Sequence, residues 1–225
     1  SGRIMRREHD GEIVVHADLS SVATGKLNDM VVAEDGTAYV GSFGFEFKRD
    51  TSIAPANLIR VAPDGSFTVE ASDLRFPNGM VITTAGTLVV AESMGNKLTA
   101  FDIGADGRLD GQRTWAAFGP DLPTESVKAA MSAAAVAPDG ICLDSDGAVW
   151  VADALHRRVI RVEEGGTITA EVVFPTGVFA CMLGGPEGNT LYACAAPNSS
   201  EAARRHTRDA SLLATRVGAT HGGRP

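Results

Sequence analysis

The stretch ICLDSDGAVWVADA at residues 141–154 places a glycine-bearing turn, DSDG, between two apolar runs. Short apolar runs joined by such a turn are typical of a β-hairpin. The same pattern occurs in MVVAEDGTAYVGS at residues 30–42, in MVITTAGTLVVAES at 80–93 and, with a longer turn, in CMLGGPEGNTLYACAA at 181–196. The chain therefore repeats one hairpin four times, which indicates a repeat architecture.

A second kind of hairpin alternates with the first. Its copies are RIMRREHDGEIVVHA (3–17), NLIRVAPDGSFTVEA (57–71), KLTAFDIGADGRLDG (97–111) and RVIRVEEGGTITAEV (158–172). Two alternating hairpins make a four-stranded unit, which favours a β-propeller over a β-sandwich because a sandwich does not require the alternation. We expect residues 1–225 to form a single all-β propeller domain with about four and a half blades.

Two segments depart from the repeat. The insertion FGPDLPTESVKAAMSAAAV at residues 118–136 contains an alanine-rich stretch that predicts a short helix. Residues 3–17 form an outer hairpin without its inner partner, so we expect a wedge with two unpaired sheet edges. Such edges pair readily with another chain, which makes an oligomer a possible form of the protein.

Composition excludes several classes of function. The chain has 225 residues and a net charge of −8. This charge argues against binding to nucleic acid, because contacts with phosphates need a basic face. We find no run of about 18 apolar residues, so no membrane span is expected. The three cysteines form no CxxC pair, which predicts buried thiols in a reducing compartment, the cytoplasm.

The turn glycines can be used to align the repeats. Counting back eight residues from Gly36, Gly86 and Gly147 gives, in that order, Asn28, Asn78 and Asp139. These three residues begin the first strand of a blade, which in a propeller lies nearest the central channel. We therefore expect their side chains, far apart in the sequence, to converge at one mouth of the channel.

The chemistry of these three side chains points to a cation. Amide and carboxylate oxygens are hard donors, which Ca²⁺, Mg²⁺ and Mn²⁺ prefer. No His or Cys falls in this register, which argues against a dedicated zinc site. The alternative is that Asn and Asp before glycine cap turns. For a single residue that alternative is the stronger, but three residues in one register favour a site.

Other polar residues are assigned structural roles. Fourteen residues after each of the three positions come Ser42, Glu92 and Asp153, which end a predicted strand and are interpreted as turn caps. His156 is interpreted as a residue of a loop or of the channel rim, since no GxSxG nucleophile motif accompanies it. The segment EAARRHTRD at 201–209 is predicted to be a solvated loop.

Several motifs together resemble a known family. LNDMVV, FPNGMV, AESMGNKLTAFDI, APDGICLD and VWVADA, with the closing GGRP, are similar to the SMP-30/gluconolactonase/regucalcin-like (SGL) lactonases. The resemblance implies a six-bladed β-propeller that holds one catalytic divalent cation in its channel and hydrolyses sugar or related lactones. It points to Ca²⁺ first, with Zn²⁺, Mg²⁺ or Mn²⁺ as alternatives.

The resemblance also implies roles for individual residues. Asn78 and Asp139 match metal ligands of the family, and Asp139 would also be the general base. Asn28 matches a second asparagine that contacts water or substrate near the metal, and we count it with the metal set. Lys26 lies where many members have a substrate-binding arginine, and Glu46 lies near the position of a substrate-contacting glutamate.

One feature of the family has no counterpart. Its third metal ligand is a glutamate in a PEGP-like motif of the first blade, whereas GPEGN at 185–189 is in the wrong register, so Glu187 is not assigned to it. We expect about one and a half N-terminal blades to be missing. The alternative function is a non-catalytic propeller that binds a small molecule, calcium or a protein partner. A strictosidine-synthase-like or paraoxonase-like propeller matches the motifs less well.

Overall fold

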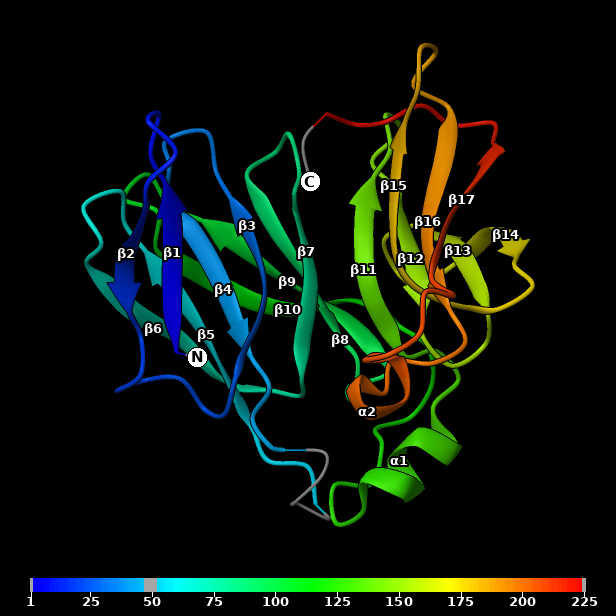
Figure 1. Ribbon diagram of the computed structural model, residues 1–225, viewed down its shortest axis with the longest axis horizontal. Helices are drawn as coiled ribbons and strands as arrows, with labels where there is room; N and C mark the ends of the chain where they lie inside the picture. Colours follow the sequence, from blue (N-terminus) through cyan, green and yellow to red (C-terminus); the bar gives the residue numbers. More distant parts are fainter. Residues whose placement is uncertain (1, 47–51, 224–225) are drawn as a thin grey trace.

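The computed structural model describes residues 2–46 and 52–223, which form five antiparallel sheets (Figure 1). The first sheet contains β1 (Arg3–Arg7) and β2 (Ile13–Asp18). The second contains β3 (Leu27–Val32), β4 (Ala38–Ser42), β5 (Ala56–Val61) and β6 (Phe67–Leu74). The third contains β7 (Pro77–Ile82), β8 (Thr87–Glu92), β9 (Lys97–Ile103) and β10 (Leu109–Ala117).

The remaining sheets follow the same order. The fourth contains β11 (Pro138–Leu143), β12 (Val149–Asp153), β13 (Arg158–Val162) and β14 (Ile168–Val173). The fifth contains β15 (Gly177–Gly184), β16 (Thr190–Ala196) and β17 (Ser211–Arg216). The predicted β-propeller is confirmed, with three blades of four strands, one of three and a two-stranded hairpin.

The blades are arranged around their first strands. β7 lies between β3 and β11, and β11 in turn lies beside β15 (Figure 1). Within the described residues, β1 and β17 are each hydrogen-bonded to one neighbouring strand. No helix in residues 2–46 and 52–223 is long and apolar enough to cross a membrane.

The core consists of layers between neighbouring blades. Val81 and Val89 of the third sheet pack against Val149 and Ile160 of the fourth. Equivalent layers separate the other neighbouring sheets. Because the three four-stranded blades are covered on both faces, their inner strands are apolar on both sides rather than alternating. Cys142 and Cys181 lie in one such layer, whereas Cys194 is exposed, contrary to the prediction that the thiols are buried.

Gly79 and Gly140 follow Asn78 and Asp139 in the sequences PNG (77–79) and PDG (138–140), and neither position has room for a side chain. A Cβ added to Gly79 would lie 2.6 Å from the carbonyl oxygen of Asp139, and one added to Gly140 would lie 2.7 Å from the Cα of Ala180. Carbon atoms do not approach backbone atoms so closely, so these sites accept glycine alone without a shift. The glycines thus let the first strands of successive blades pack backbone against backbone.

The insertion at 118–136 forms the predicted helix. α1 (Val127–Ala133) begins after Ser126, whose side chain accepts a hydrogen bond from the backbone N–H of Ala129. Ala130 and Ala134 pack with Phe45 and Phe76 in an apolar cluster. The insertion therefore covers the end of the blades where the first strands begin.

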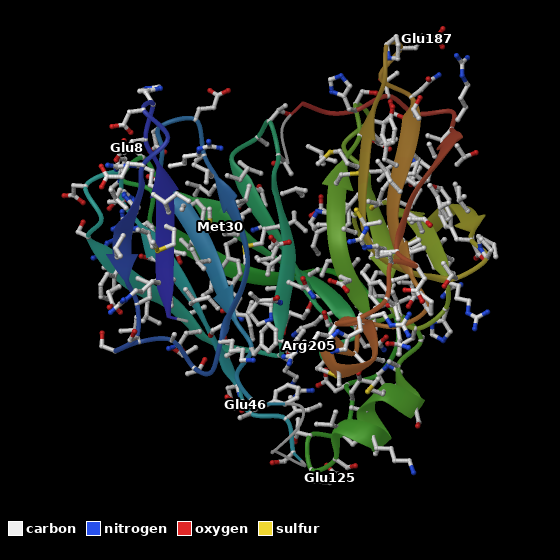
Figure 2. The ribbon with its side chains drawn as sticks, in the orientation of Figure 1. Glu8, Met30, Glu46, Glu125, Glu187 and Arg205 are labelled. Carbon is white, nitrogen blue, oxygen red and sulfur yellow. The ribbon has the colours of Figure 1, made fainter. Side chains whose placement is uncertain are left out.

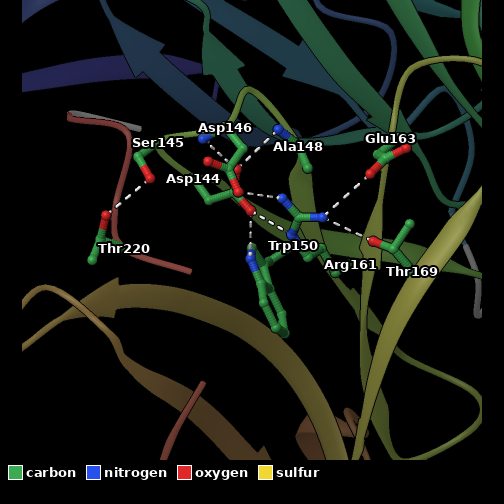
Figure 3. Close-up of polar contacts among 9 residues, drawn as sticks. All are labelled: Asp144, Ser145, Asp146, Ala148, Trp150, Arg161, Glu163, Thr169 and Thr220. Carbon is green, nitrogen blue, oxygen red and sulfur yellow. Dashed lines mark hydrogen bonds and ion pairs between the residues drawn. The ribbon is translucent and has the colours of Figure 1, made fainter. Parts of the chain in front are cut away.

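A buried carboxylate, that of Asp144, organises the turn of the fourth blade (Figure 3). It accepts hydrogen bonds from the backbone N–H groups of Asp146 and Ala148, both at 3.0 Å, from Trp150 Nε1 at 3.1 Å and from Arg161 Nε at 2.7 Å. A buried charge is stable when it is paired and fully hydrogen-bonded, as here.

Candidate functional site

The turn glycines mark truly equivalent positions. Gly36, Gly86 and Gly147 have φ angles of 86°, 78° and 84°, and the N–H of each donates to the carbonyl three residues earlier at 3.0–3.1 Å. The three turns are therefore the same structure. The three residues eight positions before them consequently occupy corresponding places in three blades.

Asn28, Asn78 and Asp139 each lie in an irregularity of the strand ladder. Pairing of the first two strands shifts between Leu27 and Met30, between Pro77 and Met80, and between Pro138 and Ile141. Such irregularities take residues out of the ladder and redirect their side chains, and they are frequent next to active sites. This shared bulge turns the three predicted side chains toward one space.

Hydrogen bonds tie these residues to the neighbouring blade. Asn28 donates through Nδ2 to the carbonyl oxygen of Pro77 at 2.9 Å. Asn78 donates through Nδ2 to the hydroxyl of Ser93 at 3.1 Å, and that hydroxyl donates to the carbonyl oxygen of Pro138 at 2.5 Å. The backbone of Pro77 therefore fixes the orientation of the Asn28 amide. The backbone of Pro138 fixes that of the Asn78 amide through the hydroxyl of Ser93.

Burial raises the pKa of Asp139 from 3.8 to about 7. A hydrogen bond from the side chain of Asn78 and one from the backbone of Gly140 lower this pKa, while the charge of Asp29 raises it. No positively charged group is among these causes. A carboxyl group whose pKa is raised toward neutrality can accept and release a proton near neutral pH, which suits a general base.

All five residues predicted for the site line one cavity with a volume of about 630 Å³. They are Lys26, Asn28, Glu46, Asn78 and Asp139. Glu46 is labelled at the lower end of the molecule in Figure 2, near the insertion that carries Glu125. The cavity thus opens at the end of the blades where the first strands begin.

The donor set fits a hard divalent cation. The amide nitrogen of Asn78 donates to the hydroxyl of Ser93, which leaves the amide oxygen as the atom that can coordinate. Nδ2 of Asn28 is likewise engaged by Pro77, which leaves its oxygen. Together with the Asp139 carboxylate, these are three oxygen donors with one formal charge. Within the described residues no group of three or more His, Cys, Asp or Glu side chains could hold a metal.

The sequence did not reveal the apolar walls of the cavity. They come from Phe43, Phe76, Met94, Met131, Ala134, Ala137, Ala154, Leu155 and Phe179. It also did not reveal the role of Asn198–Glu201, which reach the cavity from the start of α2 (Glu201–Arg204). Residues 201–209 are mostly exposed, as predicted, but the first of them form the helical turn α2, which Ser200 caps, and Glu201 lines the cavity. The Ser-x-x-Ala spacing of this cap alone carried no signal for this.

Other polar residues lie outside the site. Ser42, Glu92 and Asp153 are buried at the ends of β4, β8 and β12. Ser42 donates to the carbonyl oxygen of Asn57 in β5, whereas Glu92 and Asp153 accept hydrogen bonds from the backbone N–H groups of Arg75 and Ala137. Asp153 also accepts one from Leu155 in the following turn, so the predicted cap is seen there. His156 Nδ1 lies 2.8 Å from Asp153 and does not line the cavity. Figure 2 shows Glu187 at the tip of the β15–β16 turn, at the opposite end from Glu46.

The match to known sequences extends over most of the chain. Residues 1–196 match the model described as the SMP-30/gluconolactonase/LRE-like region. The chain belongs to this family. It is 25% identical over 184 residues to regucalcin of Danio rerio, an alignment that covers 80% of this chain and 57% of the relative. The chain thus spans little more than half the length of that relative.

Solved structures of similar fold include a gluconolactonase, a regucalcin and a luciferin-regenerating enzyme. A gluconolactonase of Xanthomonas campestris is 25% identical with a TM-score of 0.65, and the match covers 87% of this chain and 63% of that one. A calcium-binding protein, regucalcin, of Agrobacterium tumefaciens has 19% identity, a TM-score of 0.72 and coverage of 98% and 71%. A luciferin-regenerating enzyme has 18% identity, a TM-score of 0.75 and coverage of 98% and 73%. The last two show similarity of fold.

Proposed function

We propose that this chain hydrolyses small lactones with the help of one divalent cation, Ca²⁺ first among the candidates. The observation that supports it most is the meeting of Asn28, Asn78 and Asp139 in one cavity, with the pKa of Asp139 raised to about 7. Membership of the family and the similarity to a gluconolactonase point the same way. The alternative is a propeller that binds a cation or small molecule without catalysis.

A lactone is a cyclic ester, so its hydrolysis needs an activated water and a polarised carbonyl. The bound cation, held by Asn28, Asn78 and Asp139, would act as a Lewis acid on the carbonyl oxygen. The ionised carboxylate of Asp139 accepts a proton from water as the water oxygen bonds to the carbonyl carbon. The ring C–O bond then breaks, and Asp139 returns the proton to the ring oxygen, which leaves as a hydroxyl of the product hydroxy acid.

Two further residues would hold the substrate. Lys26 is exposed at the cavity and carries a positive charge, which suits a carbonyl, a hydroxyl or the carboxylate of the product. Glu46 lines the same cavity and would accept hydrogen bonds from a substrate hydroxyl. Asn28 would orient the attacking water or the lactone in addition to contacting the cation.

The test is proton release from γ- and δ-lactones, measured after chelation and again after Ca²⁺, Mn²⁺, Mg²⁺ or Zn²⁺ is restored. We expect metal-dependent hydrolysis that Asp139→Ala abolishes. Asp106→Ala, which removes an exposed carboxylate from the β9–β10 turn, is the matched control and should retain full activity. Cation binding by a folded protein without hydrolysis of any lactone would instead support the binding alternative.

A further inference from the structure

The cavity has two chemically different parts. Its oxygen donors come from the first strands, whereas its walls come from the loops around them. Phe43 follows β4, Met94 follows β8 and Leu155 follows β12, and each contributes an apolar side chain. Phe179 of β15 completes this wall. A ligand that reaches the oxygen donors is therefore surrounded by apolar groups on its other side.

An aromatic cluster forms one part of the wall. The rings of Phe43 and Phe76 have centroids 4.5 Å apart at 48°, and those of Phe45 and Phe76 are 5.7 Å apart. Phe76 has a φ of 61°, a left-handed conformation that is costly for a bulky residue. Strain of this kind persists where the surroundings impose it, and here packing with Phe45 and Met94 holds the ring at the cavity.

Many polar groups at the cavity are already engaged. Asn198 accepts a hydrogen bond from the backbone of Ser200, and Ser200 accepts one from the backbone of Ala203. Ser93 is engaged by Asn78 and Pro138. Glu46 and Glu201 also have interaction partners. These groups keep some capacity for further hydrogen bonds, but hydroxyls on the side of the ligand that faces Phe43, Leu155 and Phe179 would lose water without gaining a partner, at a cost in desolvation.

The size of the cavity leaves room beyond a lactone ring. Its volume of about 630 Å³ lies within the range of about 300–1,000 Å³ that is usual for drug-sized ligands. We infer that the preferred substrate is a lactone that carries an apolar alkyl or aryl substituent, rather than a polyhydroxylated sugar lactone. The ring would lie at Asn78 and Asp139, with the substituent against Phe43, Leu155 and Phe179. This inference rests on the proposed lactonase function.

The test is a series of γ-lactones with alkyl chains of increasing length, compared with a phenyl-substituted lactone and glucono-δ-lactone. We expect kcat/KM to rise about fourfold per added methylene until the wall is covered, since burying a methylene contributes about 0.8 kcal/mol, which is roughly this factor. Phe179→Ala and Leu155→Ala should each flatten the rise of kcat/KM with chain length. Val173→Ala, whose side chain is exposed outside the cavity, should leave the series unchanged.

Binding of the corresponding non-hydrolysable alkyl lactams, measured by calorimetry, separates the two levels of the proposal. Faster hydrolysis of glucono-δ-lactone, with no dependence on chain length, would overturn the inference and leave the lactonase function standing. If no lactone is hydrolysed but lactam affinity rises with chain length and falls in Leu155→Ala, the catalytic proposal fails and the apolar pocket stands. Absence of both effects would overturn both.

Discussion

Nδ2 of Asn78 lies 3.1 Å from the hydroxyl oxygen of Ser93. The single hydroxyl proton of Ser93 is donated to the carbonyl oxygen of Pro138. Ser93 can therefore only accept from Asn78, so the nitrogen of the amide must face it. The amide oxygen is turned away and is available to a cation. Ser93 is thus a positioning residue that joins Asn78 to the strand carrying Asp139.

Ser93→Ala is expected to weaken cation binding and lactone hydrolysis by about 10-fold or more, because the freed amide can rotate and a buried N–H loses its partner. Calorimetry with Ca²⁺ gives the affinity, and circular dichroism shows whether the fold is kept. Ser66→Ala, in the exposed β5–β6 turn, is the control. An unchanged Ca²⁺ affinity in a folded Ser93→Ala protein would exclude the positioning role.

Asp139→Asn is expected to increase stability while it abolishes hydrolysis. Because the native pKa is about 7 and the ordinary value is 3.8, the native state binds the Asp139 proton more tightly than the unfolded chain does. Below pH 4 Asp139 is protonated in both the native and the unfolded state and costs no stability. As the pH rises from 4 to about 7, the unfolded chain ionises more readily than the native state, so the free energy of unfolding falls. Asparagine does not titrate and avoids this loss.

The difference should be visible in chelator-treated protein by urea denaturation. At pH 8 we expect Asp139→Asn to raise the free energy of unfolding by about 2–4 kcal/mol relative to the original chain, and at pH 4 to have little effect. Saturating Ca²⁺ should reverse the order at pH 8, because only the carboxylate gains from binding. An equal difference at both pH values would rule out Asp139 as the titrating group.

The sequence predicted the blades and the corner residues because both follow from a local rule. A turn with glycine at a positive φ recurs in three blades, and a fixed number of residues separates it from Asn28, Asn78 and Asp139. Segments that repeat in the sequence therefore repeat in space. The repeat also places Ser42, Glu92 and Asp153 at strand ends, since each lies fourteen residues after one of the three site residues.

The walls of the cavity could not be predicted in this way because some of their positions recur between blades but their residue types do not, as with Met94 and Leu155. Phe43, Phe76 and Phe179 lie at unrelated positions of three blades, and each meets the others only through the fold. Ser93 stands one residue after Glu92 and has no marker of its own. The approach of Glu201 depends on how the segment after β16 returns across the cavity, which local periodicity does not encode.

Gly140→Ala is expected to destabilise the protein by about 2–3 kcal/mol, because the new Cβ would lie 2.7 Å from the Cα of Ala180 and force β11 away from β15. Thermal and urea denaturation measure the loss. Gly218→Ala is the matched control, since its added Cβ meets no atom within 4 Å. Equal stability of the two variants would show that the strands separate without cost.

Asp144→Ala is expected to destabilise the fourth blade by about 3–5 kcal/mol and to leave the cavity chemistry intact. Removing this carboxylate leaves the guanidinium of Arg161 and the indole N–H of Trp150 without their buried acceptor (Figure 3). Urea denaturation gives the loss, and kcat/KM per folded molecule should match that of the original chain. The double variant Asp144→Ala/Arg161→Leu should recover part of the stability, because it also removes the unpaired charge. If that variant recovers nothing, then the cost lies in the turn N–H groups of Asp146 and Ala148 rather than in the charge of Arg161.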